Sequence, residues 1–156
     1  MTFINLASGL DVWAVTASLF KFRDELKADP AGEMVLFQAN KFHERLDKWG
    51  SMRTFLAKCR RLAEGTQYEL NHARIEQLQP GAVHHWGQLQ DDLILVHVAL
   101  VTNPGAILFH GNQSLHLPVG AAVAYGVRVW NSAINVGDRG RIHLVLELEK
   151  REEITE

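Results

Sequence analysis

The fold class of this chain is decided by residues 93–109, which read LILVHVALVTNPGAILF. Apolar residues fill almost every position of Leu93–Val101 and of Ala106–Phe109, and Asn103-Pro104-Gly105 separates the two runs. Runs of this length are typical of strands that are covered on both faces, and Asn-Pro-Gly is a strong turn signal. The stretch predicts two interior strands, with His97 as a buried polar residue that must find hydrogen-bond partners.

The same rhythm of short apolar runs and turn residues extends outward in both directions, from about residue 66 to residue 148. Pairs such as Pro80-Gly81, Gly111-Asn112 and Gly137-Asp138 separate the runs. This succession is typical of an all-β sandwich or jelly roll. The expected strands are Tyr68–Leu78, Leu93–Val101, Ala106–Phe109, Ser114–Leu117, Ala122–Arg128 and Arg141–Glu147.

Before residue 66 the apolar spacing is helical instead. The stretch Trp13–Leu26 is amphipathic, and Met52, Phe55, Leu56, Cys59 and Leu62 fall on one face of a second helix. Steps of four and three residues also predict a helix that carries Val35, Ala39, Phe42, Leu46 and Trp49 on one face.

These patterns predict a single domain of the α+β class over residues 1–156. Its helical N-terminal part, residues 1–65, is expected to pack on one face of a β core formed by residues 66–148. Residues 149–156 are highly charged and are expected to form a solvated tail.

The composition is that of an ordinary soluble domain, with 47% hydrophobic and 22% charged residues among 156. A formal net charge of -2 gives no sign of the clustered basic face that nucleic acid or an anionic membrane requires. Cys59, the single cysteine, cannot close an internal disulfide, which fits a cytoplasmic setting. No apolar run reaches the roughly 18 residues that span a bilayer, and Asp11 interrupts the N-terminal stretch, which lacks the basic start of a signal peptide.

Histidines gather in the β half of the chain, and neutral imidazole is the commonest nitrogen ligand of iron, zinc and copper. Their spacing does not match a two-histidine, one-carboxylate triad, because His84-His85-Trp86-Gly87 has no carboxylate two residues after a histidine. A cupin-like metal centre of His84 or His85 with His110, His116 or His143 remains an alternative. The seven are His72, His84, His85, His97, His110, His116 and His143.

Arg141 and His143 share one face of the last expected strand, while Ile142, Leu144 and Leu146 share the other. An arginine inside a β-structure needs an anion. Two sources of that anion remain open: the carboxylate of a small dicarboxylic ligand, which a guanidinium holds through two hydrogen bonds, or a nearby Asp or Glu of the chain itself.

Four blocks in order, Leu78–Gly81 (LQPG), Val96–Leu100 (VHVAL), Trp130–Asp138 (WNSAINVGD) and Arg141–Leu144 (RIHL), resemble the aspartyl/asparaginyl β-hydroxylase family. The resemblance covers about residues 68–148. It implies a double-stranded β-helix, which is a cupin-like jelly roll, and it implies the chemistry of Fe(II)- and 2-oxoglutarate-dependent oxygenases.

Residue by residue, the resemblance gives Arg141, ten positions after Asn131, the role of holding the distal carboxylate of 2-oxoglutarate, with His97 assisting. Leu95 stands where the family has a second arginine of that carboxylate clamp. Asn131 stands at the distal histidine ligand of the iron, and an amide is a poor ligand for Fe(II). At the proximal ligand position stands Trp86, with His85 one residue short of it.

Trp86, Leu95 and Asn131 all differ from the residues that the family has at these positions. Together they predict an oxygenase-like domain without ordinary iron chemistry. Such a pseudoenzyme would bind a small carboxylate ligand, 2-oxoglutarate included, through Arg141 and His97, or would serve as a structural or protein-interaction module. The alternative is an active hydroxylase with an unusual ligand set, for instance His85 with Asp91 or Asp92.

Overall fold

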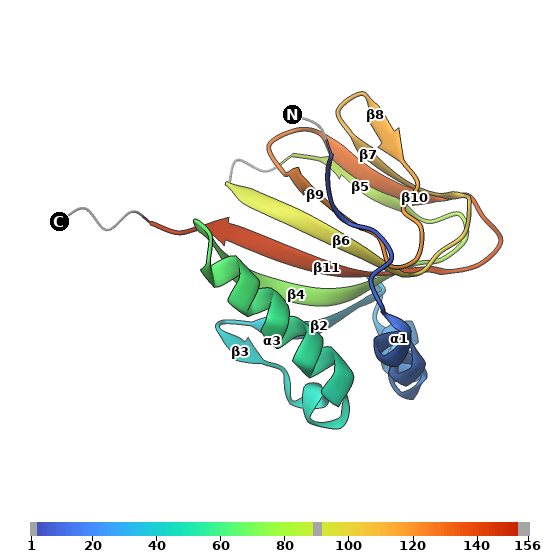
Figure 1. Ribbon diagram of the computed structural model, residues 1–156. Helices are drawn as coiled ribbons and strands as arrows, with labels where there is room; N and C mark the ends of the chain where they lie inside the picture. Colours follow the sequence, from blue (N-terminus) through green and yellow to red (C-terminus); the bar gives the residue numbers. More distant parts are fainter. Residues whose placement is uncertain (1–2, 89–91, 153–156) are drawn as a thin grey trace.

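The computed structural model describes residues 3–88 and 92–152, apart from the side chains of Phe20, His85 and Trp86. Two antiparallel sheets face each other (Figure 1). The larger has the strand order β1-β9-β6-β11-β4-β2-β3 and the smaller β5-β10-β7-β8. The strands are β1 (Ile4–Ala7), β2 (Glu33–Gln38), β3 (Lys41–Phe42), β4 (Tyr68–Leu78), β5 (Val83–Gly87), β6 (Leu93–Val101), β7 (Ala106–His110), β8 (Gln113–Leu115), β9 (Ala122–Gly126), β10 (Asn131–Asn135) and β11 (Arg141–Lys150).

From β4 to β11 the chain winds back and forth between the two sheets, which is the jelly-roll arrangement that the strand rhythm predicted. The expected strands at Tyr68–Leu78 and Leu93–Val101 are confirmed at both ends. The last strand runs on to Lys150, two residues into the segment expected to be a tail, because Glu149 and Lys150 still pair with β4.

Helices cover the larger sheet on the face that points away from the smaller one (Figure 1). One large apolar cluster joins Val15 and Leu56 to strand residues such as Ile75 and Leu144. The packing of helices on one face of the β core is therefore confirmed. The helices are α1 (Trp13–Leu19), α2 (Arg23–Ala28) and α3 (Gly50–Glu64), with short 3-10 turns η1 (Phe20–Phe22) and η2 (Glu44–Lys48).

The prediction of one helix that carries Val35 to Trp49 on one face is wrong. Residues Glu33–Gln38 form β2 instead, whose Met34 and Leu36 are buried at the two-residue period of a strand. The chain then reverses at Ala39 and Asn40, both with positive φ, and returns as β3. The strand forms because pairing with β4 places these apolar residues against α3, which a helix at this edge of the sheet would not do.

Strands β5 and β10 were not among the expected strands, because VHHWG and NSAIN lack a clean alternation of apolar and polar residues. They pair with each other in the smaller sheet and face the centre of the larger one. In the part of the chain that the structure describes, no helix has the length and apolar character needed to cross a bilayer.

Candidate functional site

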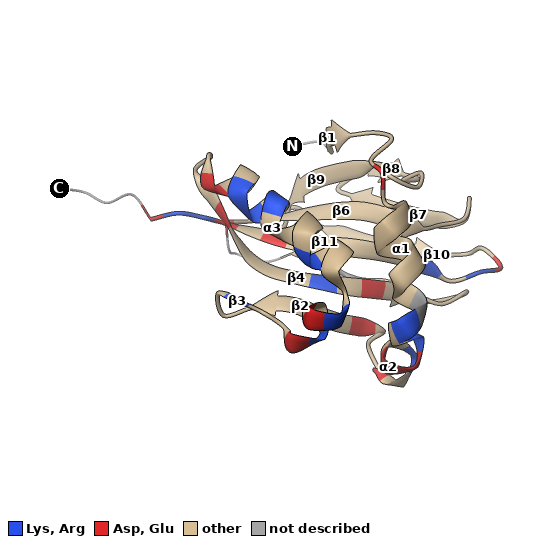
Figure 2. Cartoon of the chain, turned by 60° about the horizontal axis from the view of Figure 1, so that its bottom comes forward, with Lys and Arg blue, Asp and Glu red and all other residues tan. Residues whose placement is uncertain are grey.

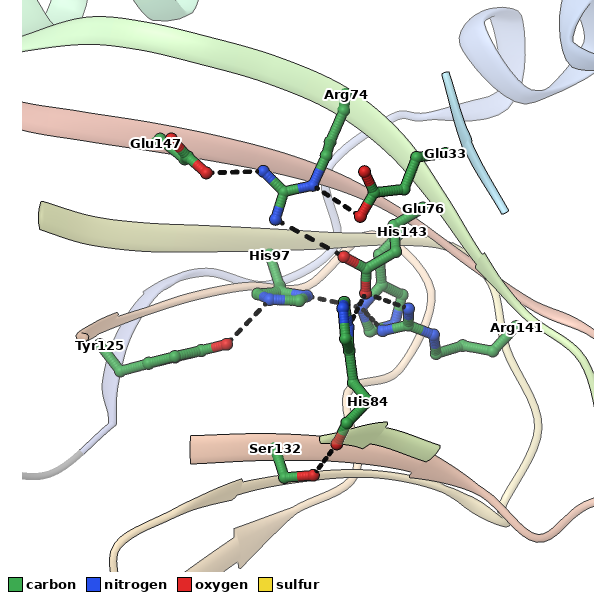
Figure 3. Close-up of polar contacts among 10 residues, drawn as sticks. All are labelled: Glu33, Arg74, Glu76, His84, His97, Tyr125, Ser132, Arg141, His143 and Glu147. Carbon is green, nitrogen blue, oxygen red and sulfur yellow. Dashed lines mark hydrogen bonds and ion pairs between the residues drawn. The ribbon is translucent and has the colours of Figure 1, made fainter. Parts of the chain in front are cut away.

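A hollow of about 300 Å³ lies between the two sheets. Strands β4, β6, β9 and β11 of the larger sheet and β5 and β10 of the smaller one all contribute to it. On β4 the residues facing the helices are apolar, such as Ala73 and Ile75, and the alternate residues point toward the smaller sheet. Its polar lining includes Arg74, Glu76, His84, His97, Tyr125 and Glu147 (Figure 3).

Behind this lining, Glu76 forms a buried ion pair with Arg141. Arg141 Nη2 donates to Glu76 Oε1 at 2.6 Å, and both side chains are almost completely buried. The pair follows from strand register, since His143 lies directly opposite Glu76 in the β4–β11 ladder and Arg141 is two residues away on the same face. The anion that Arg141 was expected to need is therefore supplied by the chain itself.

Hydrogen bonds extend this pair into a chain of five side chains, Glu76, Arg141, His143, His97 and Tyr125, which we call the buried network (Figure 3). Arg141 Nη1 lies 2.9 Å from His143 Nδ1, and His143 Nδ1 lies 3.0 Å from His97 Nδ1. At the far end, the hydroxyl of Tyr125 lies 3.0 Å from His97 Nε2.

The guanidinium fixes the direction of every bond in the buried network. A guanidinium only donates, so His143 Nδ1 must be an unprotonated acceptor. His97 must then carry its proton on Nδ1 and donate to that same acceptor. Its Nε2 is consequently a lone pair, and the hydroxyl of Tyr125 donates to it.

The burial of these groups keeps the two histidines neutral. Burial lowers the pKa of His97 to about 3, although Glu76 opposes the shift. Burial, and then the charge of Arg141, likewise hold the pKa of His143 well below its usual value. Burial also raises the pKa of Tyr125, so the buried network carries one positive and one negative charge at neutral pH.

A second group of charges lies where the hollow opens. Figure 2 shows charged residues on β4 and on the neighbouring β2. Arg74 Nη1 donates to Glu147 at 2.8 Å, whereas its contacts to Glu33 and Glu76 are longer, at 3.7 and 3.6 Å. His84 of β5 reaches across from the smaller sheet and places Nδ1 3.3 Å from Glu76 Oε1.

The contact between His84 and Glu76 favours the charged form of both side chains. The hydrogen bond to Glu76 raises the pKa of His84, although burial opposes this. Burial by itself would raise the pKa of Glu76, but His84 and Arg141 outweigh it and hold that pKa well below its usual value. Glu76 is therefore a carboxylate at neutral pH.

The candidates from the sequence come together only in part. Arg141 and His97 belong to one network, joined through His143. Asn131, at the expected distal ligand position, donates its amide to the carbonyl oxygens of Gly87 and Val129 at 3.2 and 2.9 Å. The side chains of His85 and Trp86 lie outside the described part of the chain.

The other candidates point elsewhere. Asp91 is outside the described residues, and Asp92 forms an exposed ion pair with Arg128 at 3.3 Å. His110 Nε2 and His116 Nδ1 each bond a backbone carbonyl oxygen, of Gly126 and Ala106 respectively. Among residues 3–88 and 92–152, the group whose donor atoms converge closely enough for a metal ion is Glu33, Glu76 and His84.

Sequence reasoning missed Arg74, Glu76 and Glu33. Arg74 and Glu76 alternate with apolar residues in a correctly predicted strand, which resembles a solvent-exposed face. The signal that could have found them is the fold itself, because a central strand of a jelly roll is covered on both faces and its polar residues must then line the interior.

The solved structures that resemble this fold over nearly the whole chain include the following three. The viral collagen prolyl hydroxylase vCPH of Paramecium bursaria chlorella virus 1, in complex with 2-oxoglutarate, has a TM-score of 0.63 at 12% identity and covers 97% of both chains. The two chains share the jelly-roll fold. A prolyl-4-hydroxylase of Pseudomonas putida has a TM-score of 0.60 at 16% identity, over 96% of this chain and 93% of its own.

An oxidoreductase of the 2OG-Fe(II) oxygenase family from Burkholderia pseudomallei has a TM-score of 0.63 at 14% identity, over 96% of this chain and 84% of its own. At these identities the likeness concerns the fold alone. No protein-family profile matches the sequence, and no curated protein matches it.

The described residues do not fit the Fe(II) and 2-oxoglutarate centre that the family resemblance implies. Both terminal nitrogens of Arg141 already have partners inside the protein, which leaves only a buried Nε without one among the described residues. At the distal ligand position, Asn131 directs its amide nitrogen to backbone oxygens. The site lacks both an open guanidinium for the distal carboxylate and an imidazole at that position.

Proposed function

We propose that this chain is a non-catalytic binding domain built on the oxygenase fold, descended from enzymes of the aspartyl/asparaginyl β-hydroxylase type. The observation that carries this proposal is the ion pair of Arg141 with Glu76 at 2.6 Å. An enzyme that holds the distal carboxylate of 2-oxoglutarate needs a guanidinium free to form two hydrogen bonds with it. Here Glu76 takes the place of that carboxylate.

The charges around the hollow do not favour a carboxylate ligand. Two guanidinium groups, Arg74 and Arg141, face three carboxylates, Glu33, Glu76 and Glu147. These five side chains have an excess of one negative charge, which protonation of His84 offsets, so they present no net positive charge to an anionic ligand. A neutral or cationic polar group, on a small molecule or on a partner protein, is the better match.

Titration of the purified protein with Fe(II) and 2-oxoglutarate without oxygen tests the proposal. An enzyme of this class shows a visible charge-transfer band when the metal and the cosubstrate bind together; we expect none here. We also expect no rise of the melting temperature with 2-oxoglutarate or succinate. A band in the wild-type protein at saturating metal would overturn the proposal.

The variant Glu76→Ala provides the matched comparison, because it leaves Arg141 without its internal partner. If Glu76 replaces a ligand carboxylate, succinate or acetate should stabilise this variant and leave the wild type unchanged. If the two proteins respond equally, the replacement argument fails.

An active hydroxylase with an unusual ligand set is the second candidate, and the likeness to oxygenase structures over 96% or more of this chain favours it. Asn131→His separates the two readings. It restores the imidazole that the family resemblance expects, and a gain of Fe(II) affinity would support the proposed descent. If Asn131→His binds no more Fe(II) than Asn131→Gln, that alignment loses its support.

A further inference from the structure

We propose that Glu33, Glu76 and His84 form a binding site for a divalent transition-metal ion at the entrance of the hollow. The site uses β2, β4 and β5, and none of its residues is at the ligand position that the family resemblance assigns to Asn131. It requires neither 2-oxoglutarate nor oxygenase activity. Figure 3 shows the three side chains turned toward one another.

Donor geometry is the first argument. One donor atom of each residue lies within 4.8 Å of the others, and Glu76 Oε1 is 3.3 Å from His84 Nδ1. Two ligands that bind one tetrahedral zinc ion at about 2.0–2.1 Å are roughly 3.3–3.4 Å apart. The imidazole and the buried carboxylate are already at that separation, so binding needs little rearrangement of either.

Strand register is the second, independent argument. Glu33 and Glu76 are direct partners across the antiparallel β2–β4 pair. Like charges directly opposite each other destabilise a sheet unless a cation lies between them. The guanidinium of Arg74 supplies some of that positive charge. It lies 3.7 Å from the carboxylate of Glu33 and 3.6 Å from that of Glu76, beyond hydrogen-bond distance, because it bonds to Glu147 at 2.8 Å.

The carboxylates therefore keep open coordination positions. Glu76 Oε1 accepts from Arg141, whereas Oε2 has no contact shorter than the 3.6 Å to Arg74 within the described part of the chain. Among the described residues, the carboxylate of Glu33 has its 3.7 Å contact with the same guanidinium and no closer ion pair. A metal ion that replaces the contact between His84 Nδ1 and Glu76 Oε1 would use the second lone pair of that oxygen, beside the hydrogen bond from Arg141. With a carboxylate oxygen of Glu33 as its third ligand, it would leave Arg74 its short bond to Glu147.

Ions can reach the site from solvent. The side chains of His84 and Glu33 are 49% and 32% exposed, whereas that of Glu76 is 3% exposed and forms the floor. Glu76 and His84 also line a second hollow of about 500 Å³, between the α2–β2 loop and β5. The donor atoms thus lie where the two hollows meet.

The donor set indicates the class of metal. One imidazole nitrogen with two carboxylates suits Zn(II), Mn(II) or Fe(II), while Mg(II) and Ca(II) prefer oxygen ligands alone. The excess negative charge of the site also favours a cation. The three side chains leave at least one coordination position for water, as open zinc sites do.

Titration of chelator-stripped protein with Zn(II) alone, followed by calorimetry and by melting temperature, tests this site. We expect one equivalent to bind and to raise the melting temperature. Glu33→Gln and His84→Gln should each weaken the affinity by about tenfold or more. Both side chains are partly exposed, so the folded state of these variants can be checked by circular dichroism before titration.

Glu69→Gln and His116→Gln are the matched controls, since each removes the same kind of donor outside the group. They should bind Zn(II) like the wild type, and Mg(II) in excess should not compete. Cobalt(II) should give the intense visible bands of a low-coordinate site in the wild type and lose them in His84→Gln. Unchanged affinity in both ligand variants, or no Zn(II) binding by the wild type, would overturn the proposal.

This test is separate from that of the proposed function. Zn(II) binding without an Fe(II)–2-oxoglutarate band supports both proposals, and the absence of Zn(II) binding leaves the non-catalytic reading untouched. An Fe(II)–2-oxoglutarate band that persists in Glu33→Gln would refute the proposed function without bearing on this site.

Discussion

Replacing Glu76 with glutamine should destabilise the protein strongly. The substitution keeps the shape of the side chain but leaves the buried guanidinium of Arg141 without its counter-charge at 2.6 Å. Breaking a buried pair by removing one partner costs about 3–5 kcal/mol. For a domain of this size each kcal/mol lowers the melting temperature by about 2–4 °C, so a decrease of roughly 6–20 °C is expected.

The double variant Glu76→Leu/Arg141→Met isolates the cause. It removes both charges together, and apolar replacements of buried ion pairs are often neutral or stabilising. The free energy of unfolding, measured by urea denaturation for the wild type, each single variant and the double variant, gives the coupling between the two sites. We expect the double variant to be more stable than either single variant.

The dependence of stability on pH tests the same ion pair independently. Because the pKa of Glu76 is depressed in the folded protein, its contribution is complete above its ordinary value of 4.5 and is lost as pH falls through the folded-state value. The stability gap between wild type and Glu76→Gln should therefore be constant near neutrality and shrink in acid. A gap below about 1 kcal/mol at neutral pH, or a double variant as unstable as the sum of the single ones, would refute the reasoning.

Three further outcomes are expected. The pKa of His97 is lowered from 6.5 to about 3, and that of His143 is lowered as well, so the free energy of unfolding should fall as pH decreases below about 6.5. The expected loss is up to about 1.4 kcal/mol per pH unit for each histidine. His97→Gln should reduce this pH dependence when it is measured by urea denaturation. Nitrogen-15 spectra should find His97 protonated on Nδ1 and His143 on Nε2; the reverse tautomers would contradict the bond directions in the buried network. In Gly137→Ala the new Cβ would overlap Asn103 Oδ1, so the free energy of unfolding from urea denaturation should fall by about 1–3 kcal/mol. Gly50→Ala, with nothing within 4 Å of the new Cβ, should lose none.

The interior strands could be predicted because several local signals agreed. In Leu93–Val101 an unbroken apolar run is followed by a tight turn, and the same residues form β6. In Glu33–Gln38 the signals conflicted, since the apolar residues fit a helical spacing as well as a two-residue period. Pairing with β4 decided between them, and that pairing involves residues about forty positions away.

For the site, too, local sequence predicted some features, while others depended on residues far away in the chain. That Arg141 and His97 are buried could be predicted from their strands, and the need of Arg141 for an anion followed from that burial. The identity of the anion could not be predicted. Glu76 is 65 residues earlier, and it meets Arg141 only because the register of β4 against β11 places them on one face.

The direction of the buried network also determines what the hollow can recognise. Tyr125 uses its only proton on His97, so toward an occupant of the hollow its oxygen can act only as an acceptor. The carboxylates of Glu76 and Glu147 also accept, and they lie in the same wall. A ligand with amine, amide or hydroxyl hydrogens would find complementary acceptors on this wall. Arg141 sets the direction of the bonds that leave Tyr125 as an acceptor, although it lies at the other end of the network and need not touch the ligand.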